Sequence, residues 1–441
     1  MIKYFLPDWE DRVDPNFDFI NDEYSEGHKQ DIYNNDVYAH QIFKEPPYDG
    51  ILFSLSVFQS KISLNSNKGI YKIRNHTNIK EYLKIPKSSS LEVMGDCGAF
   101  GYVNEKEPPL PFYSVENVSK LYDKLGFDYG VAPDHLVVDK ITIKDDNGKK
   151  KRVSLTQKEK DDRISITLEN AEKFLKLHHK KKYNYIPIGT AQGYNVETYR
   201  SSVKALVDMG YNYIALGSLV CYKTNTILNI LQGIQPVINE DIKIHLFGVV
   251  RLNALKKFEE LGVKSVDSTS FLRKAWLRSG QNYITKEGNG YAAIRVPQAS
   301  NPRLLKNANI NGYSIENLKK MENEVLCALN KYEKGEISID EVLDSIMRYD
   351  NLFMRNSNDG KNLREKYYKT LIDRPWESCE CPICKELGIQ VIIFRGTNRN
   401  KRRGFHNIWV LRQLMKKELS TNISINAQST LDEFSQIHGI D

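Results

Sequence analysis

Short apolar segments alternate with helix-like segments from residue 50 onward, and this alternation constrains the fold more than any other feature. Buried strands are predicted at 50–57, 91–94, 127–131, 185–189, 213–217, 242–249 and 265–267, with a last strand at 291–296. Helices are predicted between them, beginning for example at Ser114, near Thr167 and near Val196. Such alternation is typical of βαβ units and a parallel sheet. About eight strands in this order predict a closed (β/α)8 TIM-like barrel, with an open doubly wound sheet as the alternative.

The chain of 441 residues is long enough for such a barrel and further pieces, since a single α/β barrel needs only about 250 residues. We predict an N-terminal lead-in over 1–48 and a catalytic barrel over 49–304. A helical insertion over 305–372 follows, in which 315–332 and 339–349 are amphipathic. The remaining residues, 373–441, are predicted to form a zinc-binding subdomain with a basic loop and a C-terminal helix.

Composition excludes several classes of protein. No apolar run approaches the roughly 20 residues that cross a bilayer, and the N-terminus lacks the pattern of a secretory signal. We therefore expect a cytoplasmic protein without a membrane partner. The net charge of +7 permits a nucleic-acid partner without indicating one. No glycine-rich phosphate-binding motif follows any predicted strand, which disfavours dinucleotide and P-loop enzymes.

The strongest single motif is a cluster of three cysteines, Cys379, Cys381 and Cys384, with His406 further along the chain. Three thiolates and one imidazole supply the tetrahedral ligand set of a structural zinc site, with no position left open for catalysis. A strand over 388–394 and a helix start near His406 would return the chain to the cysteines. The alternative is three free thiols and an unrelated histidine.

Acidic and amide side chains follow several predicted strands. Asp96, Asp134, Gln192 and Asp267 each lie at or just after a strand end, where α/β barrels carry their active sites. Two carboxylates across a pocket can act as nucleophile and as general acid and base. By spacing alone each acid is equally explained as a loop acid or a helix cap, Asp267 before Ser-Thr-Ser above all. His135 and His245 also lie near strand ends and are interpreted as core or hydrogen-bonded histidines.

Three basic segments suggest contacts with phosphate or solvent. The segment from residue 395 to 403 holds five basic residues and no acid, namely Arg395, Arg399, Lys401, Arg402 and Arg403. We expect it to form a loop between the zinc ligands that contacts nucleic-acid phosphates, with a plain surface loop as the alternative. The runs at 149–152 and 180–182 are interpreted as solvated loops.

Taken together and in this order, the motifs resemble those of the tRNA-guanine transglycosylase superfamily over roughly residues 50–410. Asp-Cys-Gly-Ala-Phe at 96–100 is similar to the family's Asp-Ser-Gly-Gly-aromatic segment, and Asp267 with Arg273 resembles its Asp-x-x-x-x-x-Arg segment. Ala-Gln-Gly at 191–193 and Ala-Leu-Gly-Ser at 215–218 resemble its Gln-Gly and Gly-Gly elements.

The resemblance implies a role for each matching residue. Asp267 would be the nucleophile and Asp96 the general acid and base. Asp134, Gln192 and the backbone amide of Gly217 would read the base, and Arg273 would complete the substrate site. Ala99 and Ser218 depart from the family, because each replaces a glycine and adds bulk near the expected base pocket.

Within the superfamily the chain most resembles the DNA-modifying, DpdA-type branch, through residues 94–100, 245–249, 266–270 and 394–396. This resemblance implies exchange of guanine in DNA for a 7-deazaguanine base, 7-cyano-7-deazaguanine (preQ0) being expected. It also implies a DNA-modification system in which a partner ATPase would open the duplex. The alternatives are a tRNA-guanine transglycosylase acting on tRNA and a non-catalytic, zinc-containing nucleic-acid-binding protein.

Overall fold

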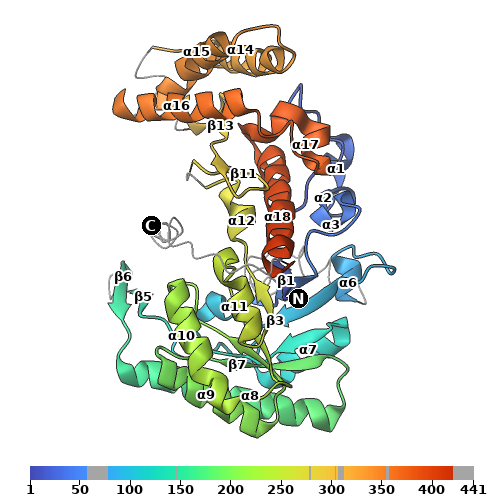
Figure 1. The fold of residues 1–441 in the computed structure, drawn as a ribbon, viewed down its shortest axis with the longest axis vertical. Helices are drawn as coiled ribbons and strands as arrows, with labels where there is room; N and C mark the ends of the chain where they lie inside the picture. Colours follow the sequence, from blue (N-terminus) through green and yellow to red (C-terminus); the bar gives the residue numbers. More distant parts are fainter. Residues whose placement is uncertain are drawn as a thin grey trace. The chain divides into compact units, whose positions relative to one another are not determined.

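The computed structural model describes residues 1–56, 78–144, 148–277, 280–302, 304–305, 312–353 and 357–420 (Figure 1). The chain forms two compact units. The barrel unit comprises Met1–Trp9, Tyr48–Thr269 and Met415–Asp441, and the C-terminal unit comprises Glu10–Pro47 and Ser270–Leu414.

The barrel unit is built on a closed parallel barrel, which confirms the predicted (β/α)8 fold. Its strands are β1 (Lys3–Pro7), β2 (Gly50–Ser54), β3 (Glu92–Asp96), β4 (Tyr129–Val131), β7 (Ile186–Ala191), β8 (Tyr213–Leu216), β9 (Lys243–Leu246) and β10 (Val263–Asp267). The strands are hydrogen-bonded in the order β1-β10-β9-β8-β7-β4-β3-β2, and β2 closes onto β1. Because all strands are parallel, their carboxyl ends meet at one face of the barrel.

Two predictions about where the barrel sequence begins and ends are wrong. Residues 1–48 were predicted as a lead-in, yet β1 lies within them and joins β2 to β10. The segment at 291–296 supplies no barrel strand, because Ile294–Arg295 forms β13 and pairs with β14 (Ile393–Phe394) in the C-terminal unit. The eighth barrel strand is therefore β1, from the start of the chain, and not the segment at 291–296.

The helices around the barrel are α7 (Val115–Leu125), α8 (Gln157–Lys181), α9 (Val196–Met209), α10 (Thr224–Ile234) and α11 (Leu255–Glu260). Ser114 caps α7, as its sequence predicts. Helix α8 begins well before the predicted start at Thr167, because Thr156 and Glu159 form a capping box there. Thr167 lies inside α8, where its hydroxyl accepts a hydrogen bond from the amide of His135 (3.0 Å).

Apolar side chains from successive strands fill the barrel. The central cluster contains Phe5, Leu52, Met94, Tyr129, Val131, Ile188, Tyr213 and Ala215. Such a filled interior leaves function to the loops at the carboxyl ends of the strands. One of these loops, between β4 and α8, carries a two-stranded antiparallel ribbon of β5 (Lys140–Lys144) and β6 (Lys150–Ser154).

The C-terminal unit contains short N-terminal helices, a helical hairpin and the cysteine cluster. Its elements are α1 (Glu26–Gln30), α2 (Ile32–Asn35), α3 (Ala39–Ile42), α12 (Ser270–Lys274), β11 (Tyr283–Ile284), β12 (Gly290–Tyr291), α14 (Ile315–Glu333), α15 (Ile339–Asp350), α16 (Ser357–Asp373) and α17 (Pro382–Leu387), and α18 (Thr397–Ser420) begins in it. The two amphipathic helices predicted for the insertion are α14 and α15. Among the described residues, no helix has the length and apolar character needed to cross a membrane.

Candidate active site

The carboxyl ends of the barrel strands place the predicted catalytic and base-reading side chains at one face. Asp96 ends β3 and Asp267 ends β10, while Gln192 directly follows β7. Asp134 lies in the loop after β4, where its side chain is buried with only 4% of its surface exposed. Carboxylate oxygens of Asp96 and Asp134 lie within 4.8 Å of one another, and Asp267 is near enough for its charge to raise the pKa of Asp96. The structure thus brings together residues that are far apart in the sequence.

Asp96 is held in a turn that its neighbours shape. Gly98 has a φ of +88°, a conformation that strains residues with a Cβ, and its backbone amide donates to the Asp96 carboxylate. The hydroxyl of Ser54, at the end of β2, also bonds to this carboxylate. Burial, the nearby charge of Asp134 and then that of Asp267 outweigh these bonds and raise the pKa of Asp96 to about 7. A group with this pKa can both donate and accept a proton near neutrality.

Asp134 and Gln192 form a closed hydrogen-bonded pair in the expected base pocket. Gln192 Nε2 donates to Asp134 Oδ2 (2.6 Å), and the thiol of Cys97 donates to Asp134 Oδ1 (3.3 Å). The Ser218 hydroxyl donates to Gln192 Oε1 (2.7 Å). This bond fixes the amide so that its NH2 group faces Asp134. Burial raises the pKa of Asp134 although Cys97 and Gln192 both donate to it.

The role predicted for the amide of Gly217 is wrong in this structure. That amide donates to the carbonyl oxygen of Ala191 (3.0 Å), which extends the pairing of β7 with β8 by one residue. Glycine is nevertheless required here, because a Cβ would lie 2.2 Å from Nε2 of Gln192. Gly217 therefore makes room for the glutamine and does not offer a donor to the base.

Asp267 is held by two donors that act on the same oxygen. Its Oδ1 accepts from the amide of Gly248 (2.9 Å) and lies 3.1 Å from Nε2 of His245. His245 Nδ1 lies 2.6 Å from the Ser265 hydroxyl, which in turn lies 2.6 Å from the Tyr213 hydroxyl. All of these side chains are buried. If the Tyr213 and Ser265 hydroxyls each donate toward the histidine, Nε2 carries a proton and donates to Asp267.

His245 was expected to be a core or hydrogen-bonded histidine, and the structure confirms that it is buried and in contact with Ser265 and Asp267. The sequence interpretation did not connect it with the predicted nucleophile. The signal available in the sequence was its place near the end of a predicted strand. Arg273, the other residue expected near the nucleophile, is half-buried in α12 of the C-terminal unit. Its role stays a prediction.

The cysteine cluster has the geometry of a zinc site. The thiols of Cys379, Cys381 and Cys384 lie 3.5, 3.3 and 3.4 Å from Nδ1 of His406. These distances match the edge of about 3.5 Å that zinc bonds of roughly 2.3 Å to sulfur and 2.0–2.1 Å to nitrogen would give a tetrahedron. His406 Nε2 lies 2.8 Å from the carbonyl oxygen of Ile284. This contact favours a proton on Nε2 and leaves Nδ1 free for a metal, so the four residues could hold zinc.

The basic segment between the zinc ligands does not form the predicted loop. Residues 397–403 form the first turns of α18, Arg395 lies just before the helix, and His406 lies within this helix and not at its start. Four basic residues of the segment are buried, namely Arg395, Arg399, Arg402 and Arg403. Lys401 is half-buried and bonds to the carbonyl oxygen of Glu10 (3.0 Å).

The buried arginines are engaged within the C-terminal unit. Arg395 and Arg399 pair with Asp22, and Arg402 pairs with Glu386. Arg403 donates to the carbonyl oxygens of Ala275, Val391 and Ile393. Guanidinium groups that are buried and already bonded cannot bind phosphate at the same time, so the prediction of phosphate contacts is wrong for these four residues.

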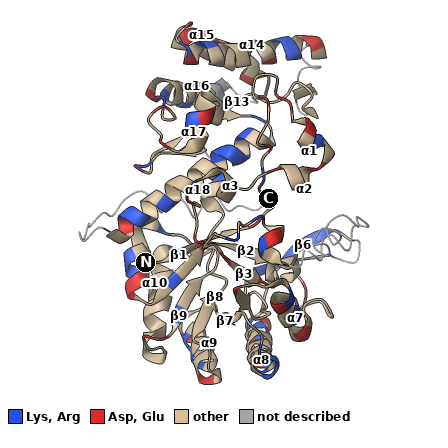
Figure 2. Ribbon diagram, turned by 90° about the vertical axis from the view of Figure 1, so that its right-hand side faces the viewer, with Lys and Arg blue, Asp and Glu red and all other residues tan. Residues whose placement is uncertain are grey.

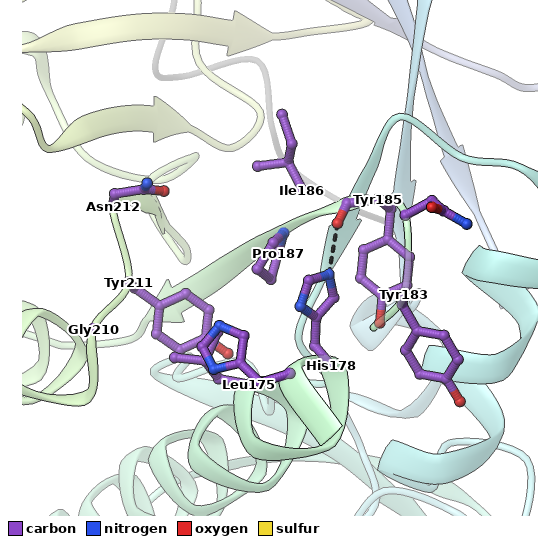
Figure 3. A pocket seen from close by; sticks show the side chains of 11 residues that line it. Leu175, His178, Tyr183, Tyr185, Ile186, Pro187, Gly210, Tyr211 and Asn212 are labelled. Carbon is purple, nitrogen blue, oxygen red and sulfur yellow. Dashed lines mark hydrogen bonds between the residues drawn. The ribbon is translucent and has the colours of Figure 1, made fainter. Parts of the chain in front are cut away.

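A cavity of about 380 Å³ lies at the opposite end of the barrel from the strand ends that carry Asp96 and Asp267 (Figure 3). It is lined by the end of α8 and by residues that precede β7 and β8, including His178, Tyr185 and Tyr211. None of the predicted catalytic or base-reading residues lines it. In barrels of this kind that end contributes stability and not catalysis.

Comparison with known proteins agrees with the geometry. Residues 139–423 match the family model described as queuine tRNA-ribosyltransferase. The chain is also 37% identical to a DNA-guanine transglycosylase from Salmonella montevideo, over 95% of this chain and 98% of that protein. The protein therefore belongs to the queuine tRNA-ribosyltransferase (tRNA-guanine transglycosylase) family of enzymes, on the branch that this DNA-guanine transglycosylase represents.

Proposed function

We propose that this enzyme exchanges guanine in DNA for a 7-deazaguanine base, with 7-cyano-7-deazaguanine as the expected incoming base, through a covalent aspartyl intermediate. The observation that carries the proposal is the placement of Asp96 and Asp267 at the carboxyl ends of β3 and β10, with carboxylate oxygens of Asp96 and Asp134 within 4.8 Å of one another. The choice of DNA is supported by the relative named DNA-guanine transglycosylase.

Base recognition begins with a guanine that has left the stack, because a base inside a duplex cannot reach a buried pocket. Asp134 would accept hydrogen bonds from the N1–H and the exocyclic amine of guanine. Gln192 would donate from Nε2 to O6. Since Gln192 Nε2 donates to Asp134 in the free enzyme, the base must separate this pair on entry.

In the first half of the exchange, Oδ2 of Asp267 would attack C1′ of the sugar. Both donors described above act on Oδ1, which leaves Oδ2 for the attack. The C1′–N9 bond breaks as the C1′–Oδ2 bond forms, and its electron pair remains on guanine. Asp96 would supply a proton so that guanine leaves as a neutral base.

In the second half, the 7-deazaguanine would occupy the same pocket. Asp96, now ionised, would take the N9 proton of the incoming base, and N9 would displace the Asp267 carboxylate from C1′. The proton released to guanine in the first half is thereby regained. The donors His245 and Gly248 would stabilise the departing carboxylate. Zinc, when bound by Cys379, Cys381, Cys384 and His406, supplies a structural cross-link.

A second candidate substrate is tRNA, because the matching family model describes a tRNA enzyme. The test is incubation of the enzyme with labelled 7-cyano-7-deazaguanine and either duplex DNA, single-stranded DNA or tRNA, followed by mass spectrometry of the nucleosides. We expect incorporation into DNA and none into tRNA. Incorporation into tRNA alone would contradict the proposal. Incorporation into single-stranded DNA alone would support a need for the partner ATPase to open the duplex.

A further inference from the structure

The β5–β6 ribbon projects from the loop that follows β4, at the catalytic face of the barrel (Figure 1). Its two strands are paired from Lys140 opposite Ser154 to Lys144 opposite Lys150. The run at 149–152, which sequence analysis interpreted as a solvated loop, mostly lies in β6 of this ribbon. The catalytic mechanism described above gives this ribbon no function.

The pairing sorts the side chains of the ribbon onto two faces, because alternate residues of a strand point to opposite sides and directly paired residues share a side. One face carries Lys140, Lys144, Lys150 and Arg152, together with Thr142 and Ser154. The other face carries Ile141, Ile143, Lys151 and Val153. We call the first face, defined by those six residues, the basic face of the ribbon.

The basic face carries charge that the rest of the described structure does not neutralise. Lys140, Lys144, Lys150 and Arg152 are all exposed, and among the described residues none of them forms an ion pair with a carboxylate. Figure 2 shows the blue of lysine and arginine at β6. Asp139, the acid at the root of the ribbon, is occupied by Lys160 at 2.6 Å. Four cations therefore remain available to a polyanion.

The root of the ribbon is fixed to the residues that read the base. The amide of Val137, three positions before the ribbon, donates to the Ser218 hydroxyl (3.1 Å) and lies 3.4 Å from Gln192 Oε1. The amide of Leu155 closes the ribbon by donating to the carbonyl oxygen of Asp139 (3.0 Å). In addition, the Thr142 amide donates to Asn104 Oδ1 (2.8 Å). A polyanion on the basic face would thus be held in register with the base pocket.

We propose that the basic face of the ribbon binds the phosphate backbone of the DNA next to the extruded guanine. This inference rests on the proposed function and deepens it, because it assigns the phosphate contacts that α18 cannot make. A two-stranded ribbon fits against a DNA groove, and cations that neutralise phosphates give affinity without sequence preference. The ribbon would bind the backbone while the barrel holds the base.

The test compares two triple variants of equal charge. The ribbon variant is Lys144→Gln, Lys150→Gln and Arg152→Gln. The control variant is Lys180→Gln, Lys181→Gln and Lys182→Gln, three exposed lysines where α8 ends, at the opposite end of the barrel. Duplex DNA binding is measured by fluorescence anisotropy between 50 and 200 mM salt, and base exchange is measured over a range of DNA concentrations up to saturation.

We expect the slope of log affinity against log salt to become shallower by about 2.7 in the ribbon variant, since each phosphate contact contributes about 0.9. Raising the salt from 50 to 200 mM would then weaken the unmodified enzyme's binding by a factor about 40 times larger than the factor for the ribbon variant. The control should keep the original slope. The ribbon variant should keep its kcat and its affinity for the free base, while the DNA concentration needed for half-maximal rate rises.

Equal slopes for the ribbon variant and the control would overturn the inference. A change of slope with tRNA but not with DNA would also overturn it. These results are separable from a failure of the proposed function, which would appear as an absence of exchange on DNA by the unmodified enzyme. An unmodified enzyme that exchanges bases in DNA, with a ribbon variant that binds as it does, would refute the ribbon inference alone.

Discussion

Asp96 shows how the surroundings of one residue determine its chemistry. An ordinary aspartate is ionised at neutral pH and cannot protonate a leaving base. Burial and the charges of Asp134 and Asp267 raise the pKa of Asp96 to about 7. The same carboxyl group can therefore serve as acid in one half of the exchange and as base in the other. This tuning also carries a consequence for stability.

The Asp96→Asn substitution should stabilise the protein at high pH while abolishing exchange. The folded protein keeps a proton on Asp96 up to about pH 7, whereas the unfolded chain loses it near 3.8, the ordinary pKa of an aspartate. The free energy of unfolding therefore falls as the pH rises through this window, and the penalty is complete above it. We expect the variant to gain about 1–3 kcal/mol at pH 8 and nothing below pH 3.8.

The measurement for this prediction is urea unfolding across that pH range. Asp208→Asn, which removes an exposed carboxylate from α9, is the control and should show no pH-dependent gain. A variant at Asp96 that is less stable than the unmodified protein at pH 8 would contradict the pKa assigned to this residue.

His245 offers a second test at this scale. Glutamine can place an N–H where the histidine has Nε2, whereas phenylalanine cannot donate. His245→Phe should lower the rate at which the incoming base displaces Asp267 from C1′ by roughly 100-fold to 1,000-fold, as expected for the loss of one donor to a carboxylate on which negative charge develops. His245→Gln should recover most of this loss.

Neither His245 variant should alter the affinity for the free base, because Asp134 and Gln192 are untouched. The control is His178→Gln, which changes a half-buried histidine that lies 2.7 Å from the carbonyl oxygen of Tyr185, away from the site. Equal impairment of the glutamine and phenylalanine variants, with both still folded, would show that the contact with Asp267 is only structural.

Among the elements, α18 differs most from its sequence-based interpretation. Clustered basic residues usually lie in solvent, so a basic loop was the natural prediction. In the structure the N-terminal residues of the C-terminal unit supply Asp22 to Arg395 and Arg399. Partners that lie more than 370 positions away leave no local signal in the sequence.

The contacts of Arg403 should make α18 contribute measurably to the free energy of unfolding. Arg403 is fully buried, and burial lowers its pKa to about 9. It donates to the backbone carbonyl oxygens of Ala275, Val391 and Ile393. Arg403→Gln should lower the free energy of unfolding by about 2–4 kcal/mol, since buried acceptors would lose their donor.

Urea unfolding of the Arg403→Gln variant is the measurement. The salt dependence of DNA binding should stay unchanged, because this guanidinium does not reach solvent. A shallower salt slope with unchanged stability would restore the interpretation of this segment as a phosphate-binding loop.

The strands show which parts of the fold a sequence can predict. Seven of the barrel strands follow from apolar runs between helices, because both faces of a parallel sheet are buried. Strand β1 (Lys3–Pro7) was missed because it lies in the segment 1–48, which is polar and aromatic with weak periodicity. Its assignment depends on pairing with β10 and β2, which are distant in the sequence.

At the scale of the whole molecule, the sequence predicts which residues form the site but not the contacts between them. Asp96, Asp134, Gln192 and Asp267 could be found because each ends or follows a strand. The contacts of His245 with Asp267 and of Ser218 with Gln192 could not be found, because each joins residues at or just after the ends of two different strands. Whether an arginine or a histidine is buried is likewise a property of the assembled fold.

The zinc site yields a prediction for the C-terminal unit as a whole. Metal analysis should find one zinc ion per chain, because the unit offers one cluster of three thiols and an imidazole among its described residues. Removal of zinc by a chelator, or the Cys381→Ser substitution, should lower the thermal midpoint, since binding energy at a structural zinc site is folding energy. The prediction would be contradicted if the purified protein contained no metal and its thermal midpoint did not change on addition of a chelator.

The most direct measurement is identification of the residue that becomes attached to DNA. The enzyme is mixed with guanine-containing DNA, denatured, digested and analysed by mass spectrometry for a peptide that carries a deoxyribose adduct. We predict an adduct on Asp267, its absence in Asp267→Ala, and its absence or slow formation in Asp96→Asn. An adduct on another side chain, or full base exchange by Asp267→Ala, would contradict the account.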